Sequence, residues 1–106
     1  FYALEGLSQL LMTVREVRQT ANPDLRIEGV LLTMADNRNN LSQQVEADAR
    51  NTLSGLVYRT VIPRNVRLSE APSHAMPVLQ YDSNSKGSAA YRELAKEFLS
   101  RQSVAA

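Results

Sequence analysis

Six polar side chains that can bind anions or exchange protons are concentrated in one segment of the chain, between Ile62 and Pro77. They are Arg64, Asn65, Arg67, Ser69, Glu70 and His74. The segment follows the strand-like run Val57–Ile62 and begins at Pro63, which lacks a backbone donor and therefore ends a regular β-ladder. The pattern predicts a polar loop stiffened by proline, and it makes this segment the first candidate for a functional site.

The polar residues of this segment do not favour acid–base catalysis. No carboxylate or nucleophile is placed near His74 in a way that suggests proton transfer, so a structural hydrogen bond is the expected role of that side chain. Glu70 is expected to anchor the loop through a nearby arginine or a backbone amide. Binding, rather than bond-breaking, is therefore the chemistry that the segment indicates.

Other catalytic and metal-binding signatures are missing from the sequence. There is no cysteine and only one histidine, which excludes thiolate metal sites and histidine clusters. The four glycines form neither of the common phosphate-binding patterns. Four aspartates, Asp24, Asp36, Asp48 and Asp82, are too scattered to suggest a catalytic pair or a two-metal site. Taken alone, the chain is expected to catalyse nothing and to hold no metal.

The overall composition is that of a globular domain. The chain has 106 residues, of which 43% are hydrophobic and 22% charged, and it contains no apolar run long enough to cross a bilayer, so no membrane partner is expected. The net charge of +1 provides no global attraction to nucleic acid. Any binding of nucleic acid must therefore come from locally placed arginines.

Apolar periodicity in the first half predicts two helices and one strand. An amphipathic helix is expected over residues 3–20, ended by Asn22-Pro23, and the apolar run Ile27–Met34 predicts a buried strand. A second helix, with Asn40 and Gln43 as a capping box, is expected to end near Gly55. Its predicted inward residues are Leu41, Val45, Ala49 and Leu53.

The second half continues the alternation of strand and helix. Val57–Ile62 is the second strand, Val78–Leu79 is expected to be briefly extended, and residues 82–85 form a turn before a last helix. The predicted inner face of that helix consists of Tyr91, Leu94, Ala95, Phe98 and Leu99. This order predicts an α/β layer fold around a parallel sheet. Because two strands make a marginal sheet and the chain opens on the apolar Phe1, the missing strands are expected upstream in a longer protein.

Four blocks of the sequence resemble the C-terminal part of ParA/Soj-type chromosome-partitioning ATPases. They are FYALEGLSQLL, IEGVLLTMADNRNNLSQQV, TVIPRNVRLSEAPSH and YDSNSKGSAAYRELAKE, in this order. The resemblance implies that residues 1–106 are the C-terminal portion of a deviant Walker P-loop domain with a Rossmann-like parallel sheet. It places the phosphate-binding loop and the magnesium-binding acids in an N-terminal half that this sequence lacks. The parent protein would be an ATPase, and these residues alone would be inactive.

The resemblance also implies functional residues and partners. The positions beside the adenine of ATP are Thr33, Met34, Pro63, Arg64 and Asn65, which agrees with ligand binding at the carboxyl ends of parallel strands. The positions that would contact DNA without reading its sequence are Arg38 and Arg67. The implied parent binds ATP with Mg²⁺, forms a homodimer on DNA, is stimulated by a ParB-type centromere-binding protein, and is cytoplasmic and associated with the nucleoid.

One residue departs from the family pattern, and several alternatives stay open. Ala75 stands where the family usually has glycine, so a backbone conformation that needs glycine is expected to be altered. Without the resemblance, Arg38 and Arg67 would be ordinary solvated loop residues. The chain could also be a stand-alone module that binds protein or nucleic acid, or part of a MinD-like positioning ATPase, although its last residues, 102–106, lack an amphipathic membrane-targeting pattern.

Overall fold

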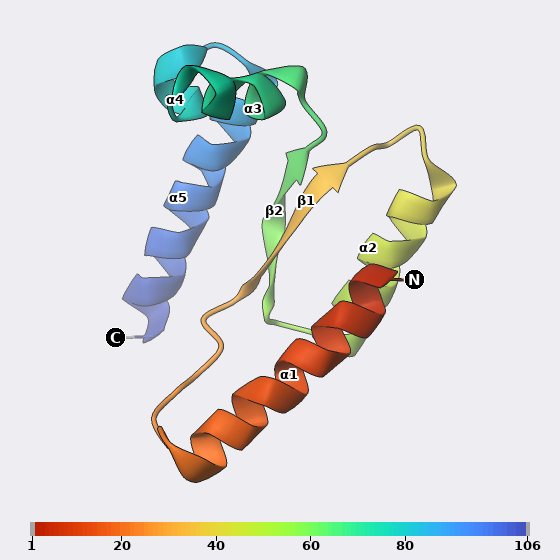
Figure 1. The fold of residues 1–106 in the computed structure, drawn as a ribbon, viewed down its shortest axis with the longest axis vertical. Helices are drawn as coiled ribbons and strands as arrows, with labels where there is room; N and C mark the ends of the chain where they lie inside the picture. The colour runs from red at the N-terminus through yellow and green to blue at the C-terminus, as the bar shows by residue number, and fades with distance from the viewer. Residues whose placement is uncertain (1, 106) are drawn as a thin grey trace.

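A computed structural model describes the backbone of residues 2–105 and the side chains of residues 5–102, so Phe1 lies outside the described residues. The elements follow one another in the order shown in Figure 1. They are α1 (Tyr2–Thr20), β1 (Val30–Ala35), α2 (Asn40–Thr52), β2 (Val57–Pro63), α3 (Val66–Glu70), the 3₁₀ helix η1 (Ala71–His74), α4 (Val78–Tyr81) and α5 (Lys86–Ala105). The first helix matches its prediction, whereas β1 begins three residues later than the sequence indicates.

The two strands form a parallel sheet, as the alternation of helices and strands predicts. They are joined through α2, which is the usual way to connect parallel neighbours. The register pairs Val30 with Val57, Leu32 with Val61 and Ala35 with Pro63. The pairing is irregular, because Leu32 lies two residues after Val30 on β1 whereas Val61 lies four residues after Val57 on β2. The chain is therefore an α/β unit with a small, bulged parallel sheet.

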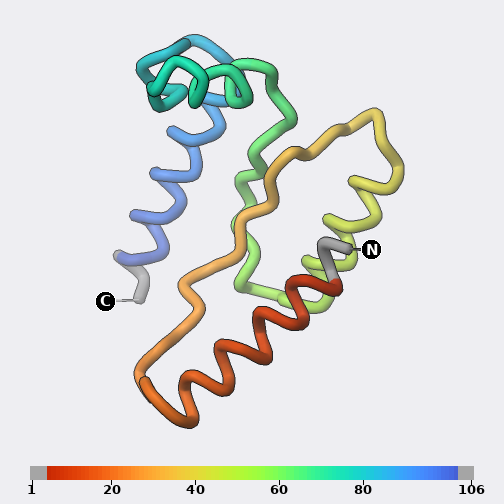
Figure 2. Tube along the Cα trace, viewed as in Figure 1, coloured from red at the N-terminus to blue at the C-terminus, as the bar shows by residue number. Residues whose placement is uncertain are grey.

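Helices lie on both sides of this sheet. Figure 1 shows α1 and α2 together on one side and α5 on the other, where α5 packs along β2. The tube in Figure 2 shows residues 21–29 leading from the end of α1 back to the start of β1. The arrangement is the layered one expected of an α/β fold.

The buried core is small and is centred on β2. Ile62 and Ala49 are each 1% exposed, and Val57 and Tyr58 are each 6% exposed. Leu41, predicted to face inward, is instead 62% exposed. The buried residues are Ala49, near the C-terminal end of α2, and Leu53, its C-cap, so the first turn contributes little to the core.

The segment predicted to be a polar loop is folded into short helices. Asn65 is the N-cap of α3, and its side-chain oxygen accepts the backbone N–H of Arg67 at 3.1 Å. Pro72 lies in the first turn of η1, where its missing N–H costs nothing. Val78–Leu79, predicted to be extended, is the start of α4. The segment therefore forms short helices with local caps, although its composition is typical of a loop.

The cap of α2 also differs from its prediction by one residue. Asn39, not Asn40, is the N-cap, since its side chain accepts the N–H of Leu41 at 2.9 Å. Gln43 contributes by donating its side-chain amide to the carbonyl of Asn37 at 2.7 Å. Gly55 follows the helix with a φ of +86°, a conformation that favours glycine.

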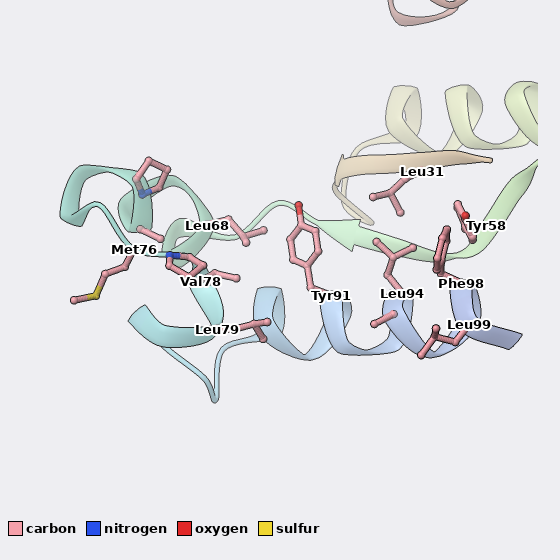
Figure 3. Close-up of a pocket in the computed structure, with 14 residues that line it drawn as sticks. Leu31, Tyr58, Leu68, Met76, Val78, Leu79, Tyr91, Leu94, Phe98 and Leu99 are labelled. Carbon is pink, nitrogen blue, oxygen red and sulfur yellow. The ribbon is translucent and has the colours of Figure 1, made fainter. Parts of the chain in front are cut away.

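The predicted inner face of α5 lines an open apolar groove instead of a closed core. Figure 3 shows Tyr91, Leu94 and Phe98 of α5 pointing toward the strands, where Leu31 of β1 lies. Leu99 also lines this groove, which has a volume of about 800 Å³. Phe98 is 38% exposed and Leu99 is 63% exposed. The helices and strands of this chain therefore cover the apolar surface only in part.

A partly buried ion pair connects α5 to the irregular part of β2. The carboxylate of Glu97 accepts the backbone N–H groups of Arg59 and Thr60, each at 2.8 Å. Arg101 contacts Glu97 at 3.3 Å, donates to the carbonyl of Val57 at 2.9 Å, and stacks over the ring of Tyr58 at 4.3 Å. Although burial acts to raise the pKa of Glu97, these backbone hydrogen bonds outweigh it and lower the pKa to about 2.

Candidate functional site at the carboxyl edge of the sheet

The ends of the two strands are tied together at one edge of the sheet. Ala35 pairs with Pro63, and the backbone N–H of Arg64 donates to the carbonyl of Ala35 at 2.9 Å. The structure therefore brings Met34, Pro63 and Arg64 to the same place, although they come from different strands. Carboxyl ends of parallel strands are where open α/β sheets bind ligands.

Met34 has an unusual backbone conformation at this edge. Its φ is 54°, and 74% of its surface is exposed to solvent. The register of the sheet also shifts between Leu32 and Ala35, so Met34 lies in an irregular stretch at the end of β1. Bulges and left-handed residues of this kind cluster next to binding sites. Thr33 precedes Met34 and is exposed as well.

Arg64 and Asn65 occupy different environments just beyond β2. Arg64 is exposed, whereas Asn65 is half-buried. The side-chain oxygen of Asn65 is already used to cap α3. The amide N–H₂ group of Asn65 is not used in this cap, and it can donate hydrogen bonds.

Arg38 extends from the loop between β1 and α2 into solvent. Its side chain is 91% exposed and contacts a single carboxylate, with Nε 3.3 Å from Asp36 Oδ1. The same oxygen accepts the backbone N–H of Arg38 at 3.0 Å. This backbone hydrogen bond is the main reason that the pKa of Asp36 lies below its ordinary value. Asp36 thus shapes the loop that presents Arg38.

Arg67 is bound by two carboxylates. Its Nη1 lies 3.0 Å from Glu70 Oε1, and its Nε lies 3.1 Å from Asp82 Oδ2. The side chain remains 50% exposed. The hydrogen bond to Glu70 is the largest cause of a raised pKa at Arg67, and the charges of Glu70 and Asp82 add to it. The prediction that Glu70 anchors the segment through an arginine is confirmed.

The end of η1 has the backbone conformation that usually requires glycine. Ala75 has φ 54° and ψ 38°, in the left-handed region, and its N–H donates to Pro72 at 3.0 Å. The conformation is therefore present with alanine in place of glycine, contrary to the expectation that it would be altered. His74, next to it, stacks on Tyr81 with ring centroids 4.8 Å apart.

Sequence reasoning missed the two aspartates that hold the candidate arginines. Asp36 could have been found, because an Asp two residues before Arg38 is suited to an Asx turn. Asp82 could not, because it reaches Arg67 only once α3, η1 and α4 have folded. Among the residues that the structure describes, no group of three His, Cys, Asp or Glu side chains could hold a metal ion, and no helix is long and apolar enough to span a bilayer.

The sequence is similar to those of several known bacterial proteins. The chain is 60% identical to the sporulation initiation inhibitor protein Soj of Bacillus subtilis over 97 residues, which cover 92% of this chain and 38% of the relative. It is 56% identical to the chromosome partitioning protein ParA of Caulobacter vibrioides over 102 residues, covering 96% of this chain and 38% of the relative. It is 52% identical to the chromosome-partitioning ATPase Soj of Thermus thermophilus over 101 residues, covering 95% and 41%.

The resemblance to ParA/Soj-type proteins that the sequence predicts is confirmed by these identities. The chain nevertheless spans only about two fifths of the length of these relatives. A family model described as the CobQ/CobB/MinD/ParA nucleotide binding domain matches residues 4–78, which is well over half of the chain. The parallel sheet and its covering helices are consistent with part of such a Rossmann-like domain. This chain therefore belongs to the CobQ/CobB/MinD/ParA family of nucleotide-binding domains.

Proposed function

We propose that residues 1–106 are the C-terminal portion of a ParA-type ATPase that partitions chromosomes or plasmids. The observation that carries this proposal is the identity of 60% to a Soj protein over 92% of the chain. The sequence contains no phosphate-binding loop, so the groups that hold the phosphates and Mg²⁺ would belong to the remainder of the parent protein. The 106 residues alone would then hydrolyse no ATP.

In this proposal the carboxyl edge of the sheet contributes the adenine side of the nucleotide site. The contributing residues would be Thr33, Met34, Pro63, Arg64 and Asn65. Support comes from the hydrogen bond between Arg64 and Ala35, which holds the two strand ends in one site. The exposed side chain of Met34 offers an apolar surface for a ring, and the amide of Asn65 offers a donor for a ring nitrogen. The bound ATP would supply the phosphoanhydride bond that water hydrolyses in the intact parent.

The proposal assigns Arg38 and Arg67 to contacts with the phosphates of duplex DNA. Both are exposed enough to be reached, at 91% and 50% of their side chains. A homodimer would present two copies of each arginine, and linked weak contacts of this kind bind far more tightly together than singly. The parent would act in the bacterial cytoplasm on the nucleoid, with a ParB-type protein as its stimulating partner.

The open groove beside α5 supports the view that these residues are part of a larger domain. Its lining is almost entirely apolar, and parallel sheets are normally covered on both faces. An apolar surface of this size would be covered by helices and strands of the remaining three fifths of the parent, as judged from the relatives. The groove would then be part of the domain core.

The DNA assignment is tested by replacing each arginine in the intact protein. Arg38→Ala and Arg67→Ala are expected to weaken retention on nonspecific duplex DNA in the presence of ATP. Each is also expected to reduce the slope of log affinity against log salt by about 0.9 for every phosphate that the arginine neutralises. Binding of a fluorescent ATP analogue is expected to stay unchanged. Retention that equals the wild type at low salt would contradict the assignment of that arginine.

A further inference from the structure

The guanidinium of Arg67 lies between two carboxylates from different helices. Glu70 is the last residue of α3, and Asp82 is the C-cap of α4. Their oxygens approach Nη1 and Nε at 3.0 Å and 3.1 Å, distances typical of charge-assisted hydrogen bonds. Arg67 therefore carries one positive charge against two negative charges at contact distance.

Asp82 is held firmly in the position from which it contacts Arg67. Its Oδ1 accepts the backbone N–H of Asn84 at 3.2 Å. Its carbonyl accepts the hydroxyl groups of Ser85 at 2.9 Å and of the fully buried Ser88 at 2.6 Å. The backbone of Asp82 is thus bonded to Ser85 and Ser88 near the start of α5, and its carboxylate is bonded to Asn84 as well as to Arg67.

Arg38 provides a contrast within the same molecule. It contacts one carboxylate, Asp36, at the longer distance of 3.3 Å, and its side chain is 91% exposed, compared with 50% for Arg67. A phosphate that approaches Arg38 meets a largely free guanidinium. A phosphate that approaches Arg67 must displace or tolerate two carboxylates of its own sign.

We infer that Glu70 and Asp82 compete with DNA phosphate for Arg67 and thereby limit the strength of this contact. The inference rests on the proposed contact between Arg67 and DNA. Because exposed ion pairs are weak, a DNA phosphate can displace the carboxylates from Arg67. Displacement is easier when a dimer contacts DNA with several arginines at once. The two carboxylates would therefore keep DNA binding by a single subunit weak and reversible.

The test replaces each carboxylate by its neutral amide in the intact protein with ATP, and measures affinity for a nonspecific duplex across a salt series. Asp82→Asn is expected to tighten binding by about two- to fivefold, the factor that corresponds to one exposed ion pair. Asparagine keeps an oxygen for the N–H of Asn84 and leaves the backbone carbonyl unchanged, so the fold is expected to survive. Glu70→Gln serves as a second variant that does not involve this turn.

The matched control is Glu93→Gln. It removes the same charge from an exposed pair with Lys96 at 3.3 Å on α5, without touching Arg67. We expect Asp82→Asn or Glu70→Gln to increase the affinity for DNA by more than this control does. We also expect the increase to disappear when Arg67 is replaced by alanine. Weaker binding by both amide variants would mean that the carboxylates orient Arg67 for phosphate, and would overturn the inference.

The outcomes separate this inference from the DNA assignment itself. If Arg67→Ala weakens binding but neither amide variant exceeds the Glu93→Gln control, Arg67 contacts DNA and the competition is refuted. If Arg67→Ala leaves binding unchanged, the assignment of Arg67 to DNA fails, whatever the amide variants do.

Discussion

At the scale of single residues, Ala75 carries a steric cost that glycine would remove. A left-handed conformation costs an L-residue about 1–2 kcal/mol, whereas glycine costs about 0.5–1 kcal/mol of extra chain entropy on folding. Since Ala75 has φ 54°, Ala75→Gly is expected to raise the free energy of unfolding by about 0.5–1 kcal/mol. Urea unfolding followed by circular dichroism measures this change.

Ala89→Gly is the matched control for the glycine substitution. Ala89 is an exposed residue in regular helix, so the same replacement there is expected to lower the free energy of unfolding by about 1 kcal/mol. Destabilisation at both positions would show that the left-handed conformation of Ala75 imposes no cost.

Glu97 is the residue whose charge contributes most clearly to folding. Its side chain is 8% exposed, and it accepts two backbone hydrogen bonds from β2. Glu97→Gln keeps one acceptor but places N–H groups against a backbone donor, so it is expected to lower the free energy of unfolding by about 2 kcal/mol at pH 7. Glu93→Gln, in an exposed pair, is expected to change it by less than about 0.5 kcal/mol.

The same residue predicts a pH dependence. The pKa of Glu97 falls from 4.5 to about 2 in the folded chain, so the unfolded chain binds the proton more readily. The stabilising contribution is therefore complete above pH 4.5 and declines as the pH falls towards 2. Unfolding measured between these pH values is expected to show a smaller slope for Glu97→Gln than for the wild type. Identical slopes would mean that the carboxylate is not selectively stabilised.

At the scale of elements, helices and strands with a repeating apolar pattern could be predicted from the sequence, whereas the short helices could not. The periodic leucines of α1 and the β-branched run of β2 identified those elements closely, because burial of one face recurs along their length. The segment from Asn65 to Pro77 was wrongly predicted as a loop, and Val78–Leu79 was wrongly predicted as extended. The helices of these residues are too short to show periodicity, and they depend on caps and on ion pairs that exist only in the folded chain.

The candidate site was predictable in its position but not in its electrostatics. Residues that follow two parallel strands must meet at one edge, and Met34 and Arg64 do so. The pairing of Arg67 with Asp82, and the clamp of Glu97 on β2, connect residues far apart in sequence. No spacing rule in the sequence links them.

Close packing of α5 beneath α3 gives a prediction at the scale of elements. A Cβ added at Gly87 would lie 2.7 Å from the Cγ of Leu68, closer than carbon atoms can approach. Gly87→Ala is therefore expected to force the Leu68 side chain of α3 to move and to lower the free energy of unfolding by about 1–3 kcal/mol, as overpacking does elsewhere. Thermal unfolding of the intact protein measures the effect.

Gly6→Ala provides the comparison for Gly87→Ala. A Cβ at Gly6 meets nothing within 4 Å, and the residue lies inside α1. Replacement there is expected to stabilise the protein by about 0.5–1 kcal/mol through helix propensity alone. Opposite signs at the two glycines would establish that packing, not propensity, governs Gly87.

At the scale of the whole molecule, the interior is asymmetric. β2 is covered by α5 and bonded to Glu97, and it contributes Val57, Tyr58 and Ile62, more buried apolar residues than any other element. The residues of β1 are half-buried or exposed, and the groove beside this strand is open to solvent. A two-stranded parallel sheet exposed in this way is poorly stabilised by itself. This asymmetry supports the proposal that further strands and helices of a parent domain adjoin β1 and the groove.

Thiol labelling of α5 tests this proposal within the intact protein. Leu99 lines the groove and is 63% exposed in this chain, whereas the side chain of Lys96, on the polar side of the same helix, is 76% exposed. The two cysteine variants are made in a cysteine-free background. If the rest of the domain covers the groove, Leu99→Cys is expected to react with a maleimide at least about tenfold more slowly than Lys96→Cys. The reason is that a covered site must open before it can react. Rates are compared with those of the same variants in denaturant, which corrects for intrinsic reactivity. Similar rates at the two positions would mean that the groove stays open in the intact protein, and that its apolar lining must have another occupant.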